Sequence, residues 1–183
     1  MSLADEALKS DRRDAFAHYA KSRALTLHGD HSDALVELGI ARDLNPNFAL
    51  THYGLGFTLS MLGRIEDSIP HFERAIRQSP NDPMKWTFEV MQGIALWHIL
   101  RYEEAKVLLD RARHHPNASF WPSAWAAVNF VSLGDVVSAR HAVDDLKKSR
   151  GDRNLEAVGD LIRLSASNAV EEALSNLRQA GLD

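Results

Sequence analysis

The side chains whose types and spacing could do chemistry are histidines and acidic pairs. His28 and His31 flank two residues in the string HGDH, and imidazoles this close in sequence could in principle hold a metal ion. They fall on a turn between two predicted helices and no third ligand accompanies them, so we interpret the string as a solvated turn. His114 and His115 close another predicted helix, where the negative end of the helix dipole favours a cation. The sequence therefore predicts no metal site.

Acidic pairs recur at one position of a repeating pattern: Glu66 with Asp67, Glu103 with Glu104, and Glu171 with Glu172. A catalytic acid and base would not repeat in this way, whereas carboxylates at the start of successive helices stabilise the positive ends of their dipoles. The sequence also contains no glycine-rich phosphate loop and no nucleophile elbow. We therefore predict no catalytic residues and no cofactor.

Composition narrows the class of protein and of partner. The chain has 183 residues, 45% of them hydrophobic and 25% charged, which is ordinary for a globular protein. Its net charge of -4 and pI near 6.1 argue against nucleic-acid binding. The absence of cysteine excludes disulfides and thiolate metal sites, and no apolar run is long enough to span a membrane. We expect a cytoplasmic protein with neither nucleic acid nor membrane as partner.

The elements that position these residues follow from a pattern of small and large residues over 49–82. Two amphipathic runs are separated by a turn at Gly63, and Pro80 ends the second run. The same pattern occurs earlier in the chain, where a second set of residues stands in register with Gly63, Ser68, Phe72, Ala75 and Pro80: Gly29, Ala34, Leu38, Ala41 and Pro46. Five coincidences at one offset indicate a repeat of two short helices.

This order of small, large and turn residues resembles the tetratricopeptide (TPR) repeat, and the offset matches its period of about 34 residues. The resemblance implies an all-α fold, a right-handed superhelix of about five helix hairpins. We predict a single domain over 4–183 whose repeats cover about 15–48, 49–82, 83–119, 120–153 and 154–183. Residues 4–14 would be the remnant of a preceding repeat, and residues 1–3 an addition from cloning.

The third and later repeats depart from the regular pattern. Three residues are added between Pro80 and Gly93, so we predict a lengthened helix over about 83–99, capped by Asp82, that carries Lys85 and Trp86 to the mouth of the groove described below. Leu100 replaces the turn glycine. The fourth repeat is predicted to end at Gly151. The fifth has Leu161 where helices need a small residue, so its helices are expected to splay.

A narrower resemblance comes from the strings LNPNFALTHYGLGFTLSMLGR, RQSPNDP and LSNLRQAGLD. They look like the C-terminal TPR segments of bacterial class III adenylate or guanylate cyclases. This resemblance implies a regulatory or interaction tail of a signalling protein, because no residue of a cyclase catalytic domain can be placed in the chain.

In TPR proteins the first helices of successive repeats line a concave groove. Aligning the chain to them places an unusually aromatic set there: Tyr19, Arg23, Tyr53, Phe57, Met61, Val90, Ile94, Trp97, His98, Trp121 and Val128. The best-known groove of the family clamps a peptide carboxylate with Lys and Asn where this chain has Tyr19 and Arg23, so we expect an apolar or aromatic ligand instead. The alternative is that part of this set packs between helices; Trp97 and Trp125 then belong to the core, and Tyr53, Phe57 and Trp121 are the residues expected to be exposed.

Three functions remain compatible with the sequence. The chain is a scaffold that binds a peptide or another segment of its own parent protein, or a self-association module that pairs its parent protein, or an enzyme. The first fits the predicted groove and the lack of catalytic groups best.

Overall fold

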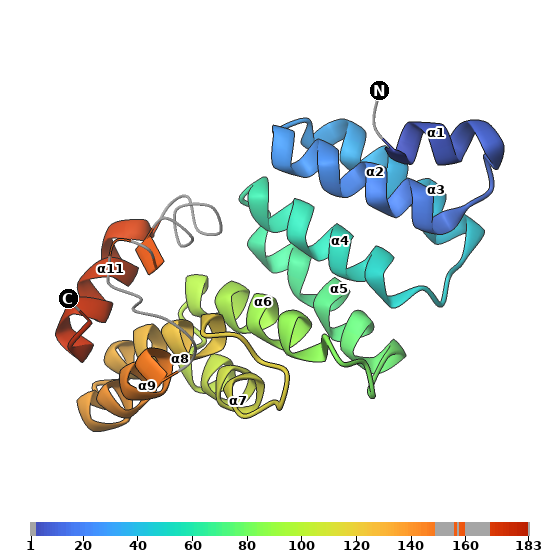
Figure 1. Cartoon of the computed structure of the whole chain (residues 1–183). Helices are drawn as coiled ribbons and strands as arrows, with labels where there is room; N and C mark the ends of the chain where they lie inside the picture. Colours follow the sequence, from blue (N-terminus) through green and yellow to red (C-terminus); the bar gives the residue numbers. More distant parts are fainter. Residues whose placement is uncertain (1–2, 149–155, 157, 160–168, 183) are drawn as a thin grey trace. The chain divides into compact units, whose positions relative to one another are not determined.

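The computed structural model describes residues 3–148, 156, 158–159 and 169–182, and this part of the chain contains helices and no strand (Figure 1). The all-α prediction is confirmed. None of the described helices is long and apolar enough to cross a membrane. The chain divides into two compact units, Met1–Pro80 (the N-terminal unit) and Asn81–Asp183 (the C-terminal unit), which are described separately.

The N-terminal unit contains one short helix and two helix hairpins. Helix α1 (Leu3–Ser10) packs on α2 (Ala15–His28), which pairs with α3 (His31–Leu44); α4 (Ala49–Met61) pairs with α5 (Ile65–Gln78). Helix α4 also packs on both α3 and α2, more extensively on α3. The hairpins stack because each first helix fits against the preceding pair.

The described residues of the C-terminal unit form two further hairpins and the helix α11. Helix α6 (Lys85–His98) pairs with α7 (Tyr102–Arg113), and α8 (Trp121–Ser132) pairs with α9 (Val136–Lys148). Helix α8 packs more on α7 than on α6, just as α4 packs more on α3 than on α2 in the N-terminal unit. Helix α11 (Val170–Ala180) packs on α8 and α9.

The turns within the hairpins share a left-handed residue. Gly29, Gly63 and Gly134 have φ of 95°, 74° and 76°, as expected where a helix ends in the conformation that glycine adopts without steric cost. Leu100 takes the same conformation with φ of 62°. The turn geometry is therefore kept without glycine, at the cost of backbone strain in an exposed residue.

Small residues lie where the helices pack most closely. Ala34, Ala75, Ala105 and Ala139 are completely buried. A Cβ atom added to Gly56 would lie 2.7 Å from the Phe72 ring, and one added to Gly93 would lie 2.7 Å from Leu109. Small residues are required at these positions because the facing side chain occupies the space.

The prediction of a lengthened helix in the third repeat is wrong. Helix α6 has 14 residues, as many as α2, and begins at Lys85 rather than Pro83. The Asp82 carboxylate accepts a hydrogen bond from the Met84 N–H at 2.8 Å, which stabilises a turn before the helix. The added residues therefore lie in the connection, and Trp86 is buried rather than at a groove mouth. Gly151, the predicted end of the fourth repeat, and Leu161 of the fifth repeat lie outside the described residues.

Candidate functional site

An aromatic face with one cation at its centre lies on the first helices of the N-terminal unit. The Arg23 guanidinium of α2 stacks over Phe57 of α4, its Cζ atom 4.2 Å from the ring centroid, and lies 5.6 Å from the centroid of Tyr53. Met61 follows one turn after Phe57 on the same helix. We call Tyr19, Arg23, Tyr53, Phe57 and Met61 the Arg23 face; the structure brings the first four of them together.

Arg23 carries an unpaired hydrogen-bond donor. Its side chain is half-buried, and its Nη1 atom is inaccessible to solvent and has no hydrogen-bond partner among the residues that the structure describes. Stacking on aromatic rings stabilises a guanidinium but accepts none of its in-plane N–H bonds. A buried donor without an acceptor costs free energy, and an atom that solvent cannot reach is also closed to a ligand in this arrangement of side chains.

Tyr19 extends the Arg23 face toward the start of α2. Its ring lies 5.8 Å from Phe48 and 6.2 Å from the exposed Phe16, centroid to centroid. Burial raises the pKa of Tyr19 to about 12, although the nearby Arg23 guanidinium opposes the shift. Phe16 and Phe48 line a surface pocket of about 470 Å³ together with Leu44. The pocket gives the aromatic cluster an opening to solvent.

Phe57 is less accessible than predicted. Only 9% of its surface is exposed, because the Arg23 guanidinium covers one face of the ring. Tyr53, Tyr19 and Met61 are half-buried and keep part of their surface in solvent. The expectation that Phe57 is exposed is therefore wrong. Its ring is buried beneath the stacked Arg23 guanidinium.

In the C-terminal unit most of the predicted groove residues are in the core. Val90, Ile94, Trp97 and Val128 are all at most 2% exposed. Trp97 packs edge-on against the fully buried Trp125, which confirms the expectation that both belong to the core. His98 and Trp121 are half-buried, and burial lowers the pKa of His98. These two offer the accessible part of the predicted set in this unit.

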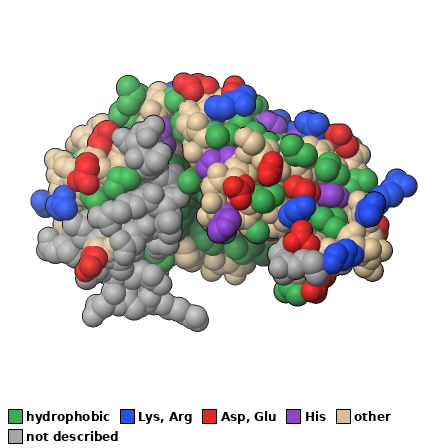
Figure 2. Space-filling model, turned by 90° about the horizontal axis from the view of Figure 1, so that it is seen from above, with side chains coloured by type: hydrophobic (Ala, Val, Ile, Leu, Met, Phe, Trp, Pro, Cys, Tyr) green, Lys and Arg blue, Asp and Glu red, His purple; other side chains and the backbone are tan. Residues whose placement is uncertain are grey.

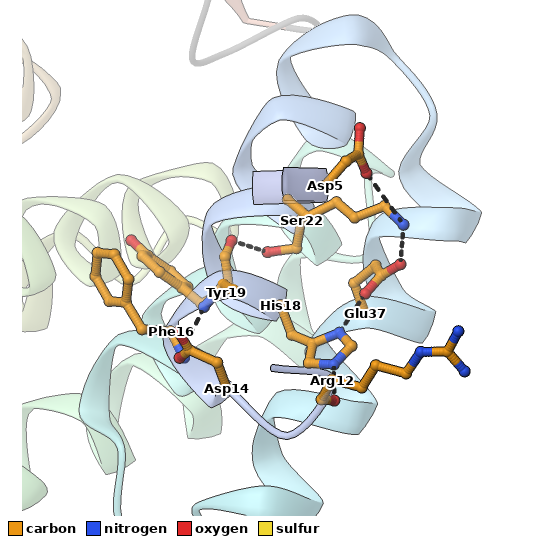
Figure 3. A network of polar contacts seen from close by, with 10 residues as sticks. Asp5, Arg12, Asp14, Phe16, His18, Tyr19, Ser22 and Glu37 are labelled. Atoms are coloured by element: carbon orange, nitrogen blue, oxygen red, sulfur yellow. Dashed lines mark hydrogen bonds and ion pairs between the residues drawn. The ribbon is translucent and has the colours of Figure 1, made fainter. Parts of the chain in front are cut away.

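The structure also shows a buried titratable position that the sequence reasoning missed. His18 on α2 contacts the Glu37 carboxylate of α3 at 2.6 Å through Nδ1, and its Nε2 lies 3.1 Å from the carbonyl oxygen of Arg12 (Figure 3). Lys21 contacts the other Glu37 oxygen at 2.7 Å. Burial raises the pKa of Glu37, but the hydrogen bonds from Lys21 and His18 outweigh it, so the net pKa is lowered. Tyr19 and Phe16 point away from this network (Figure 3).

The same position holds a titratable pair in the next two hairpins. His52 occupies the place of His18 in the following repeat, and its Nδ1 lies 3.2 Å from Nδ1 of His71, which occupies the place of Glu37. Glu89 occupies the place of His18 in the third repeat and pairs with Arg111 at 2.7 Å. All three first-helix residues are at least nine-tenths buried. Comparing polar residues at the repeat spacing would have found them.

Other clusters do not add chemistry to this picture. HGDH lies on the α2–α3 turn as predicted, with His28 exposed. Within the described ranges no three His, Asp or Glu side chains converge as metal ligands would. On the face drawn in Figure 2, acidic and basic side chains are interspersed rather than separated by sign.

Comparisons with known proteins identify the fold. No protein-family model matches the sequence, and no curated protein matches it. Among solved structures, the chain is similar to YrrB, described as a TPR protein with an unusual peptide-binding site, with a TM-score of 0.68 and 18% identity over 98% of this chain and 91% of that one. It is also similar to the type IV pilus biogenesis factor PilW, with a TM-score of 0.76 and 18% identity over 97% of this chain and 78% of PilW.

A third similar structure is PilF from Pseudomonas aeruginosa, with a TM-score of 0.74 and 19% identity over 98% of this chain and 78% of PilF. Identities this low show the fold alone. The chain has the all-α fold of TPR proteins, built from consecutive helix hairpins.

Proposed function

We propose that the chain is a non-catalytic scaffold that binds a peptide or protein segment through the Arg23 face. The observation that carries the proposal is the stack of the Arg23 guanidinium on Phe57 beside Tyr53, in which Arg23, Tyr53 and Tyr19 keep part of their surface in solvent. A ligand with an oxygen acceptor beside an apolar side chain would contact both the cation and the rings.

A peptide supplies this combination along its whole length. Its backbone carbonyls are acceptors, and its apolar side chains can pack on Tyr53, Tyr19 and the pocket beside Phe16 and Phe48. Wide amphipathic side chains such as Tyr and Arg are common at binding hot spots. The peptide-binding site in the description of YrrB is consistent with this use of the fold, but YrrB's site belongs to that protein.

The proposal can be tested with a displayed random-peptide library selected on the full chain. We expect Arg23→Ala and Tyr53→Ala each to weaken the selected peptides by about 1–2 kcal/mol, or roughly 5- to 30-fold in Kd. Arg77→Ala is the matched control, because Arg77 is exposed on α5. Circular dichroism must show unchanged helical content in all variants. Peptides that bind Arg23→Ala and Tyr53→Ala as tightly as the unaltered chain would place the site elsewhere.

Two finer proposals rest on sequence resemblance. One is that the scaffold is part of an adenylate cyclase-like parent protein. This proposal depends on the strings LNPNFALTHYGLGFTLSMLGR, RQSPNDP and LSNLRQAGLD, and the similar solved structures do not support it. The other is self-association of the parent protein, which light scattering at several concentrations separates from binding of a foreign peptide.

A further inference from the structure

An open aromatic pocket lies at the start of helix α2, beside the Arg23 face. Its apolar wall is formed by Phe16 of α2, Leu44 at the end of α3, and Phe48, the N-cap residue of α4. The ring centroids of Phe16 and Phe48 lie 6.3 Å apart, and 59% of Phe16 is exposed. The volume of about 470 Å³ is sufficient for a long side chain. We call this cavity the Phe16 pocket.

Tyr19 joins the Phe16 pocket to the Arg23 face. Its ring centroid lies 6.2 Å from that of Phe16 and 5.8 Å from that of Phe48, and the rings of Phe16 and Tyr19 point to the same side of α2 (Figure 3). Phe16 and Arg23 lie about two helical turns apart, or about 10 Å along the axis of α2. An extended peptide covers this distance with about three residues, so a ligand on the Arg23 face can reach the pocket.

The polar rim of the Phe16 pocket carries an excess of negative charge. Asp11 and Asp14 line the pocket together with one cation, Arg13. Within the described part of the chain, none of these three side chains takes part in an ion pair. Two carboxylates therefore stand beside the aromatic wall, and the single guanidinium of the rim does not neutralise either of them by contact.

The hydrogen bonds of the two carboxylates are local. Asp14 accepts from the N–H groups of Phe16 and Ala17 at 2.8 and 3.2 Å, and Asp11 accepts from the Arg13 N–H at 2.8 Å. All three bonds end on Oδ1. The Asp14 bonds satisfy exposed N–H groups at the positive end of α2, so this helix end is already matched by a negative charge before a ligand arrives.

This combination of an apolar wall and a negative rim favours one kind of side chain. Lysine and arginine have an apolar stem that packs on rings such as Phe16 and Phe48, and a charged head that aromatic faces and carboxylates attract. An acidic side chain would be repelled, and a wholly apolar one would shield the carboxylates from water without pairing them. Arg23 lies about one Debye length away, so solvent and salt largely screen its repulsion of a second cation.

We propose that the Phe16 pocket holds a lysine or arginine side chain of the segment that binds on the Arg23 face. The inference rests on the proposed function and names a chemical feature of the partner. The basic residue stands about three residues from the part of the ligand that contacts Arg23. Arg13, the one cation of the rim, opposes this binding and limits its strength.

Small probes test the pocket without any selected peptide. N-acetyl-lysine methylamide and its neutral counterpart, N-acetyl-norleucine methylamide, are titrated separately into the isotope-labelled full chain, and the amide resonances are followed by NMR. We expect the lysine probe to shift resonances of residues 11–17 and 44–48 and to bind roughly 5-fold more tightly than the norleucine probe. Arg13→Gln should increase this preference, because it removes the opposing charge.

The double variant Asp11→Asn/Asp14→Asn should abolish the preference for lysine, and asparagine keeps the oxygen that caps α2. Glu66→Gln/Asp144→Asn is the matched control, because it changes the net charge equally at two exposed residues of α5 and α9. Circular dichroism checks that all variants keep their helical content. Should the double variant lose it, Arg13→Gln decides, since an unchanged preference for lysine there overturns the proposal.

The proposal is also overturned by equal affinity for the two probes, by shifts confined to other parts of the chain, or by a preference that Asp11→Asn/Asp14→Asn retains. The proposed function fails in a different way. If selected peptides depend on Arg23 and Tyr53 while the lysine probe shows no preference, only the inference about the pocket is wrong. If the lysine probe behaves as expected while selected peptides ignore Arg23→Ala and Tyr53→Ala, the pocket is supported and the Arg23 face is not.

Discussion

Acidification should destabilise the N-terminal unit through the His52–His71 pair. Burial first, and then the charges of Arg74, His71 and Arg42, lower the pKa of His52 from 6.5 to about 4. Burial and the same two arginines lower the pKa of His71, while Asp67 opposes the shift. Below pH 6.5 the unfolded chain therefore takes up protons that the folded chain resists.

The sign and the size of the effect follow from linkage. A histidine with a lowered pKa contributes its full stability above the unfolded value of 6.5, and that stability is lost as pH falls toward about 4. The complete loss for His52 is about 3 kcal/mol, because one pKa unit corresponds to about 1.4 kcal/mol. Between pH 7 and pH 5.5 the expected loss is about 1 kcal/mol. His71 adds to it in the same direction.

The assay is urea unfolding followed by circular dichroism at 222 nm, at both pH values. His52→Leu should lower the loss between pH 7 and pH 5.5 by about 1 kcal/mol, whatever it does to stability at pH 7. His141→Gln should leave the loss unchanged, because His141 is exposed on α9. If His52→Leu and the unaltered chain lose equal stability on acidification, the buried pair is not the cause.

Three other changes test the packing. Leu100→Gly should raise stability by about 1 kcal/mol, as a residue with positive φ is replaced by one that adopts it freely; a lowered urea midpoint would contradict this. Phe72→Ala should cost about 3–5 kcal/mol because the ring is fully buried, whereas Phe16→Ala at an exposed site should cost under about 1 kcal/mol in the same assay. Gly93→Ala should cost about 1–3 kcal/mol, since the new Cβ would lie 2.7 Å from Leu109; an unchanged thermal midpoint would show that Leu109 moves aside freely.

The sequence by itself determined the hairpins, their turns and their closest contacts. These features are local and recur at the repeat spacing. Gly29 and Gly63 therefore identified turns, and Ala34 and Ala75 identified places where two helices pack closely, without knowledge of the rest of the fold. The same spacing carried the signal for His18 and His52, which was visible in the sequence but was not used.

Only the tertiary structure decided which apolar residues of the first helices remain accessible. A helical pattern shows that a face is apolar, but burial depends on what covers that face. Phe57 is covered by Arg23 from the preceding hairpin, and Val128 lies where the distant Asn176 bonds to its carbonyl. Such contacts between distant residues leave no periodic trace in the sequence, because each is made once. The start of α6 is different, because it is set locally: the Asp82 carboxylate accepts a hydrogen bond from the N–H of Met84, two residues on, and the turn that this bond stabilises precedes the helix.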